Sequence, residues 1–231
     1  MSRVFAVVLV VAAAAAIQPA SVGANGSSMP SAPSGGGSSS MPVVTPEQLA
    51  AQAYNSGISH KNKGLKLEAD AEKATKDKEK ILGKAKDEYG KALKDFKKAL
   101  DLKPDAFQAF NGMGFALRKT GEPVKALEMY DKALALAPGF PDALEYRGEA
   151  YLALNRIDDA KAAYLELFAK DRDQAAQLMK AMTDWVAKRQ ADPAGVDPAA
   201  VTAFDTWIQE RAKVAALTVN MSLASNHSIW R

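Results

Sequence analysis

The side chains that most often carry out catalysis are scarce in this chain. Its 231 residues include no cysteine and only two histidines, His60 and His227. Without cysteine, neither a thiolate nucleophile nor a cysteine-ligated metal cluster can form. Carboxylate pairs, which could support acid–base chemistry, occur at Asp158–Asp159 and at Asp171 with Asp173. Both pairs lie at expected helix ends, where they complement the helix dipole, so the sequence predicts a protein that is not an enzyme and has no cofactor or metal.

The overall charge balance gives no indication of a nucleic-acid partner. The net charge of +3 is the difference between 30 basic and 27 acidic side chains. A nucleic-acid-binding domain would be expected to gather basic residues into a stripe. Apolar residues make up 48% of the chain and aromatic residues 7%, and the abundance of alanine favours closely packed helices over strands.

The N-terminus has the pattern of an export signal. Arg3 precedes an unbroken apolar run over residues 4–17, which is shorter than the ~20 residues of a membrane span. Small residues then lead to Ala24, which predicts a signal peptide over residues 1–24 and a periplasmic protein with no stable membrane span after cleavage. Cleavage after Ala20 and an uncleaved anchor are the alternatives. Residues 25–46 are rich in Gly, Ser and Pro and predict a disordered linker.

A 34-residue period dominates the rest of the chain. Gly114, Ala126 and Tyr130 recur as Gly148, Ala160 and Tyr164, and an earlier stretch with Ala92 and Phe96 matches the same pattern. Units repeated at this period cannot bury their apolar faces alone and must stack on one another. We therefore expect pairs of helices in which small and aromatic residues form the contacts between helices. These repeat-packing residues are Gly57, Ala92, Phe96, Gly114, Ala126, Tyr130, Gly148, Ala160 and Tyr164. Ala126 and Ala160 are expected to face Gly114 and Gly148.

The first repeat is split. Gly57 is the counterpart of Gly114, yet the second-helix residue Ala92 comes much later in the chain than the period requires. The delay equals the length of an insertion over residues 64–86, which contains good helix formers and no proline. The insertion predicts a first helical hairpin with long arms and a bend near residues 75–78; a charged loop is the alternative.

The small residue in each first helix, the alanine and aromatic pair, and the closing prolines Pro104 and Pro138 resemble tetratricopeptide repeats. The resemblance is close over about residues 85–171 and implies an all-α, right-handed array of about three helical hairpins. It divides the chain into a split first repeat (47–106), a second repeat (107–140) and a third repeat (141–174). C-terminal capping helices (175–217) and a flexible tail (218–231) are expected to follow.

The resemblance also implies a concave groove, lined by the first helix of each repeat, that binds a peptide or a partner helix. The matching positions are Asn55, Gln108, Asn111, Phe115, Arg118, Asp142, Glu145, Glu149 and Leu152. Residues 142–149 form an acidic wall, which favours a protein or peptide partner with a basic group. We therefore expect a non-catalytic periplasmic scaffold in cell-envelope assembly or secretion. The alternatives are an accessory module of a cell-wall-active enzyme complex and a homo-oligomeric structural protein.

Overall fold

A computed structural model describes the backbone of residues 44–228 and the side chains of residues 44–217. The predicted signal peptide and most of the predicted linker lie outside the described residues. The described part of that linker ends in a capping box, because Thr45 Oγ1 accepts a hydrogen bond from Gln48 N and Gln48 Oε1 accepts one from Thr45 N. A helix therefore begins at Pro46, the last residue assigned to the linker.

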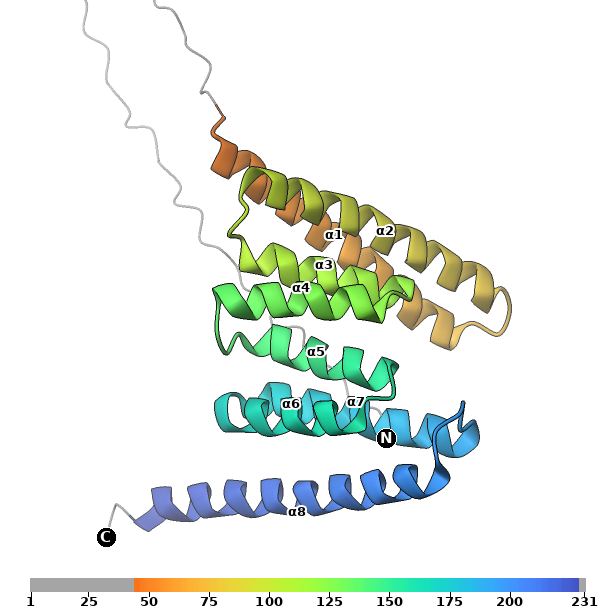
Figure 1. Ribbon diagram of the computed structural model, residues 1–231, viewed down its shortest axis with the longest axis vertical. Helices are drawn as coiled ribbons and strands as arrows, with labels where there is room; N and C mark the ends of the chain where they lie inside the picture. The colour runs from red at the N-terminus through yellow and green to blue at the C-terminus, as the bar shows by residue number, and fades with distance from the viewer. Residues whose placement is uncertain (1–43, 229–231) are drawn as a thin grey trace, which may run out of the picture. The chain divides into compact units, whose positions relative to one another are not determined.

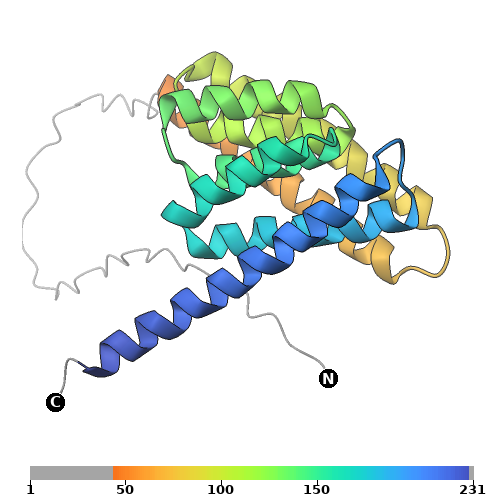
Figure 2. The same cartoon turned by 60° about the horizontal axis from the view of Figure 1, so that its bottom comes forward.

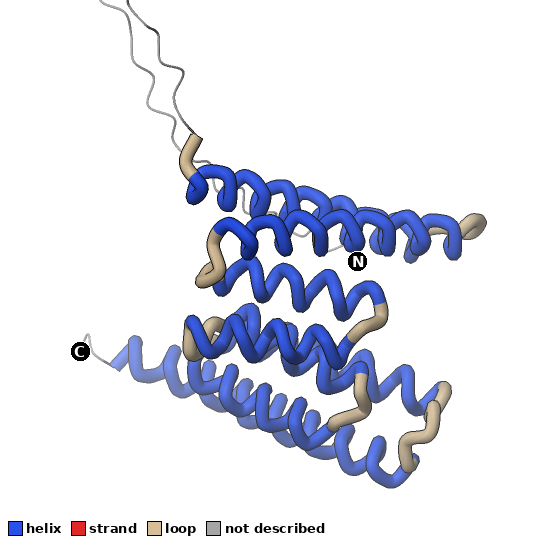
Figure 3. Tube along the Cα trace, turned by 45° about the horizontal axis from the view of Figure 1, so that its top comes forward, coloured by secondary structure: helices blue, strands red, loops and turns tan. Residues whose placement is uncertain are grey.

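The described residues form helices joined by short loops (Figure 3). The helices are α1 (Pro46–Lys73), α2 (Lys78–Leu102), α3 (Phe107–Thr120), α4 (Pro123–Leu136), α5 (Pro141–Ala153), α6 (Ile157–Lys170), α7 (Arg172–Ala191) and α8 (Pro198–Ser228). The all-α repeat architecture expected from the 34-residue period is confirmed. Each helix packs on its successor, and the odd-numbered helices α1, α3, α5 and α7 also contact one another in succession.

The first hairpin is longer than the others, as the insertion predicts. Helix α1 has 28 residues and α2 has 25, whereas α3 and α4 have 14 each. The bend spans residues 74–77, and its last residue, Asp77, has a positive φ of 59°. The arms of α1 and α2 therefore extend past the ends of α3 and α4 (Figure 1).

Aromatic rings, rather than alanines, lie against Gly57, Gly64, Gly112 and Gly114. The ring of Phe96 is wedged between Gly57 of α1 and Gly112 of α3, where a Cβ atom would come within 2.7 and 2.6 Å of it. Helix α1 is approached in the same way at Gly64, whose Cβ would lie 2.4 Å from the ring of Tyr89. These contacts are too close for any side chain larger than hydrogen, so each glycine permits the ring to fill the space between helices.

The expected partners of Gly114 and Gly148 need correction. Ala126 and Ala160 are fully buried, but the side chain nearest to Gly114 is the ring of Tyr130. The side chain nearest to Gly148 is Leu178 of α7, which belongs to the cap. The reason is that an alanine methyl leaves space that the longer side chain on the adjoining turn or helix fills.

The C-terminal helices bury their own apolar cluster. Asp171 caps α7 by accepting hydrogen bonds from the backbone of Asp173 and Gln174 at 3.0 and 2.9 Å. Trp185 of α7 donates a hydrogen bond to the carbonyl of Leu152 at 2.7 Å and packs edge-on against Phe204 of α8. The cap thus closes the end of the third repeat.

The prediction of a flexible tail over 218–231 is wrong for residues 218–228, because α8 continues to Ser228. No proline or glycine occurs between Ala199 and Ser228, so nothing in the sequence ends the helix at residue 217. The later turns of α8 extend beyond the other helices (Figure 2).

Candidate functional site

The odd-numbered helices α1, α3, α5 and α7 share one surface, here called the odd-helix face. Three hollows mark it. One lies between α1 and α3 and includes Tyr54 and Gln108. The others lie at α5 and α7, where Glu149 and Asp184 line both. The helices that the resemblance assigns to a groove are therefore the ones that form this surface.

Most of the predicted groove residues come together on the odd-helix face. Gln108, Arg118, Glu145, Glu149 and Leu152 line its hollows. The exposed fraction of Leu152 is only 4%, so it contributes to the floor of its hollow.

Three further predicted residues lie deeper or are already engaged. Phe115 is 4% exposed and Asn111 is 7% exposed. The Oδ1 atom of Asn111 accepts no hydrogen bond from the described residues. Asp142 accepts a hydrogen bond of 2.9 Å from Nε2 of Gln174.

Asn55, like the three residues above, lines none of these hollows. Its side chain is exposed, and its neighbour Tyr54 lines the hollow with Gln108 instead. Tyr54 corresponds to Asn111 when one repeat period and the insertion over residues 64–86 are both counted. The same count, applied from Arg118, leads to Lys61, which the sequence analysis also missed. The spacing between the repeats therefore indicates Tyr54, and the prediction of Asn55 is wrong by one position.

An ion pair joins the second and third repeats across the odd-helix face. The guanidinium of Arg118 on α3 pairs with the carboxylate of Glu149 on α5. Arg118 also lies over the rings of Phe115 and Tyr146, 5.4 and 5.7 Å from their centroids. The cation is thus held in place by a carboxylate and two aromatic faces.

Glu145 is the most unusual charged residue of this face. It is 4% exposed and forms no ion pair with any described residue. Burial, followed by the neighbouring charges of Glu149 and Asp142, raises the pKa of its carboxyl to about 8, although Arg118 opposes the shift. The wall therefore holds a carboxyl group whose ionised form lacks a close cation.

The first repeat contributes a lysine and a tyrosine to the same region. Lys61 lies 5.2 Å from the centroid of the Phe115 ring. Burial lowers the pKa of Lys61, while Asp142 and Glu145 oppose this change. Burial, and then the charge of Asp142, raises the pKa of the Tyr54 hydroxyl. The carboxylates of α5 are therefore close enough to α1 to affect the pKa values of its side chains.

The residues first considered for catalysis lie elsewhere. His60 Nδ1 is 2.7 Å from Glu88 Oε2 on the first hairpin, and the side chain of His227 lies outside the described residues. Asp159 pairs with Arg156 in the first turn of α6. Within residues 44–217, no cluster of three or more His, Asp or Glu side chains has the geometry of a metal site. In the part of the chain that the structure describes, no helix meets the length and apolarity that a membrane span requires.

Comparison with known proteins identifies the repeat. Two family models, each described as "Tetratricopeptide repeat", match residues 84–141 and 117–183. No curated protein matches the sequence. A solved structure titled "First TPR of Spaghetti (RPAP3) bound to HSP90 peptide SRMEEVD" is similar at 21% identity and a TM-score of 0.39, covering 53% of this chain and 95% of that chain. The first TPR domain of human RPAP3 is similar at 20% identity and a TM-score of 0.40, covering 57% and 98%.

Proposed function

Because residues 84–183 place this chain in the tetratricopeptide-repeat family, we propose that it is a non-catalytic scaffold that binds a protein or peptide partner on its odd-helix face. The observation that carries the proposal is the joint surface of α1, α3, α5 and α7, with hollows between the helices. A segment that crosses this face would contact every repeat at once.

The ligand that best fits this surface carries a lysine or arginine side chain. The acidic wall on α5 contains Asp142, Glu145 and Glu149, and only Glu149 has an ion-pair partner among the described residues. A cation placed next to Glu145 would stabilise its ionised form, so the carboxyl group would release its proton to solvent as the cation binds. Lys61 and Arg118 would limit the number of cations that the wall accepts.

Selection from a random peptide library displayed on phage tests this proposal. We expect wild-type protein to enrich peptides that contain lysine or arginine. The Glu145→Gln variant, which keeps the shape of the side chain and cannot ionise when a cation binds, should lose this enrichment. Substituting Glu145 gives a clearer test than substituting Glu149, because a change at Glu149 would also leave Arg118 without its ion-pair partner.

A matched control separates this effect from a general change in charge. Glu128 is exposed on α4, away from the odd-helix face, and Glu128→Gln should enrich the same peptides as the wild type. If Glu145→Gln retained the full preference for basic residues, the proposed role of the acidic wall would be wrong.

We further propose that the chain is exported to a bacterial periplasm, where it serves cell-envelope assembly or secretion. The apolar run over residues 4–17 and the small residues before Ala24 support this proposal. The intact mass of protein recovered from the periplasmic fraction tests it, since cleavage after Ala24 would leave a chain that begins at Asn25. A full-length mass, or recovery only from the cytoplasm, would contradict it.

A further inference from the structure

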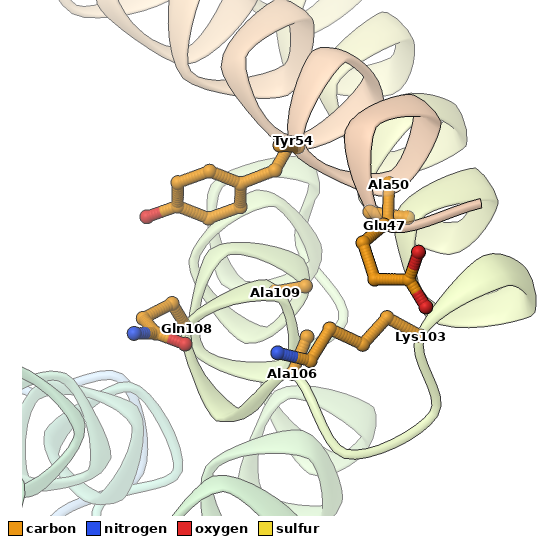
Figure 4. Close-up of a pocket in the computed structure, with 9 residues that line it drawn as sticks. Glu47, Ala50, Tyr54, Lys103, Ala106, Gln108 and Ala109 are labelled. Carbon is orange, nitrogen blue, oxygen red and sulfur yellow. The ribbon is translucent and has the colours of Figure 1, made fainter. Parts of the chain in front are cut away.

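The hollow between the first and second repeats has an apolar floor and a polar rim. Its volume is about 330 Å³, and it lies where the start of α1 faces the end of α2 and the start of α3. Figure 4 shows Tyr54 and Gln108 at one edge and Glu47 and Lys103 at the other. The remaining lining residues are all alanines: Ala50, Ala51, Ala99, Ala106 and Ala109. We call this hollow the alanine pocket.

The repeat itself shows what normally occupies such a place. Ala106 corresponds to Phe140 one period later, and Ala50 corresponds to Phe107 when the insertion over residues 64–86 is counted as well. Phe107 and Phe140 pack edge to face with their centroids 5.1 Å apart. At the interface between the second and third repeats, therefore, two aromatic rings occupy the position that is hollow at the first interface.

The floor beneath the two positions is the same. Ala99 and Ala109 correspond to Ala133 and Ala143, and all four are buried with at most 1% of their surface exposed. The backbone frame is thus repeated, and the two interfaces differ in the side chains that complete it. The alanine pocket has the frame that holds two aromatic rings at the next interface, and among the described residues no aromatic ring fills it.

We propose that the alanine pocket receives one aromatic side chain of the partner, in the place that Phe107 and Phe140 occupy at the next interface. This inference rests on the proposed binding function and names a second feature of its ligand. Removing an aromatic ring from water against an apolar floor is favourable. Edge-to-face packing against the exposed side of Tyr54 is available at the rim (Figure 4).

The residues at the rim of the alanine pocket indicate where the partner's aromatic ring lies relative to its basic group. Tyr54 lines the pocket and also responds to the charge of Asp142, the first residue of the acidic wall. Gln108 offers an amide at the same edge, which can bind the main chain of an extended ligand. The partner is therefore a peptide segment in which an aromatic residue lies near a lysine or arginine.

The test replaces alanines that line the pocket by larger side chains that fill it. The double variant Ala50→Phe with Ala106→Phe recreates the aromatic pair of the next interface, and Ala51→Leu is a milder filling variant at the exposed rim. Ala69→Phe is the matched control, because Ala69 is exposed on the long arm of α1, outside the pocket. Circular dichroism and thermal unfolding establish that each variant is folded.

The same phage selection gives the readout. Wild-type protein and Ala69→Phe should enrich peptides with an aromatic residue near a basic one. The filled variants should keep the basic preference and lose the aromatic one. For an enriched peptide, replacing its aromatic residue by alanine should weaken binding to the wild type by about 10- to 100-fold and leave binding to the filled variants unchanged.

The outcomes separate the two proposals. Enrichment of basic peptides with no aromatic preference overturns the pocket assignment alone, whereas enrichment of neither overturns both proposals. Sedimentation of the wild type and the filled variants tests a second copy as the occupant. A dimer of the wild type that the filled variants lose would assign the pocket to self-association and overturn the inference.

Discussion

The raised pKa of Glu145 makes the stability of the fold depend on pH in a way that one substitution should remove. In the folded protein the carboxyl pKa lies at about 8, against an ordinary value of 4.5. Between these values the folded protein keeps a proton that the unfolded chain has lost. Stability from this group is therefore complete below about pH 4.5, falls as the pH rises, and is lost above about pH 8.

The size of the effect follows from the interval between the two values. One pH unit corresponds to about 1.4 kcal/mol for a single proton, so the interval from 4.5 to about 8 gives a ceiling of about 5 kcal/mol. Glutamine has nearly the shape of a protonated glutamate and cannot ionise. Glu145→Gln should therefore match the wild type near pH 4.5 and exceed it by about 2 to 5 kcal/mol at pH 9.

The groups around Glu145 must stay in place for this comparison to hold. They are Asp142 and Glu149 on α5, Arg118 on α3, and Lys180 and Asp184 on α7. Lys61 of α1 also interacts electrostatically with Glu145. Because the substitution changes none of these residues, the difference between the two proteins reports the ionisation of Glu145 together with its effect on these charged neighbours.

Urea denaturation at a series of pH values between 4.5 and 9 measures the difference. Glu128→Gln, on the exposed side of α4, should follow the wild type throughout and serves as the control. If the curves for wild type and Glu145→Gln ran parallel across the whole range, the assignment of a buried, proton-retaining carboxyl to the acidic wall would be refuted.

Three further substitutions test how the repeats are packed, each by its free energy of unfolding in urea. Gly64→Ala should destabilise the protein by about 1–3 kcal/mol, because a Cβ atom would lie 2.4 Å from the ring of Tyr89. The control Gly83→Ala, in open space on α2, should instead stabilise the protein by about 0.5–1 kcal/mol. Equal effects of the two substitutions would contradict the close packing at Gly64. Phe96→Ala should cost about 3–5 kcal/mol, since this fully buried ring fills the space between Gly57 and Gly112; a cost below about 1 kcal/mol would mean that the ring does not fill it. Trp185→Phe should cost about 1 kcal/mol through loss of the hydrogen bond to the Leu152 carbonyl; no loss of stability would contradict a buried bond at this position.

The period predicts the fold well because a repeat fixes both the local structure and the neighbour of each unit. The split first repeat follows from counting positions between Gly57 and Ala92. The helical nature of the insertion follows from its composition, and the structure places its bend at residues 74–77. Where no period operates, as after residue 217, the end of α8 was misplaced.

The sequence predicts the candidate site less well than the fold, because the burial and the ion pairs of each side chain decide what it can bind. Arg118 and Glu149 both match groove positions, yet they pair with each other. Glu145 looks like any surface glutamate in the sequence, and only the packing of α3, α5 and α7 shows that it is buried. The alanine pocket becomes visible when Ala50 and Ala106 are compared with Phe107 and Phe140 in space.

The claim that the odd-helix face binds the partner has a direct test. An amide chemical-shift titration of isotope-labelled protein with a peptide from the phage selection maps the contact surface. We predict shifts concentrated in α1, α3, α5 and α7, with the largest near Tyr54 and Glu145. Shifts confined to α2, α4 and α6, or none at saturating peptide, would contradict the account.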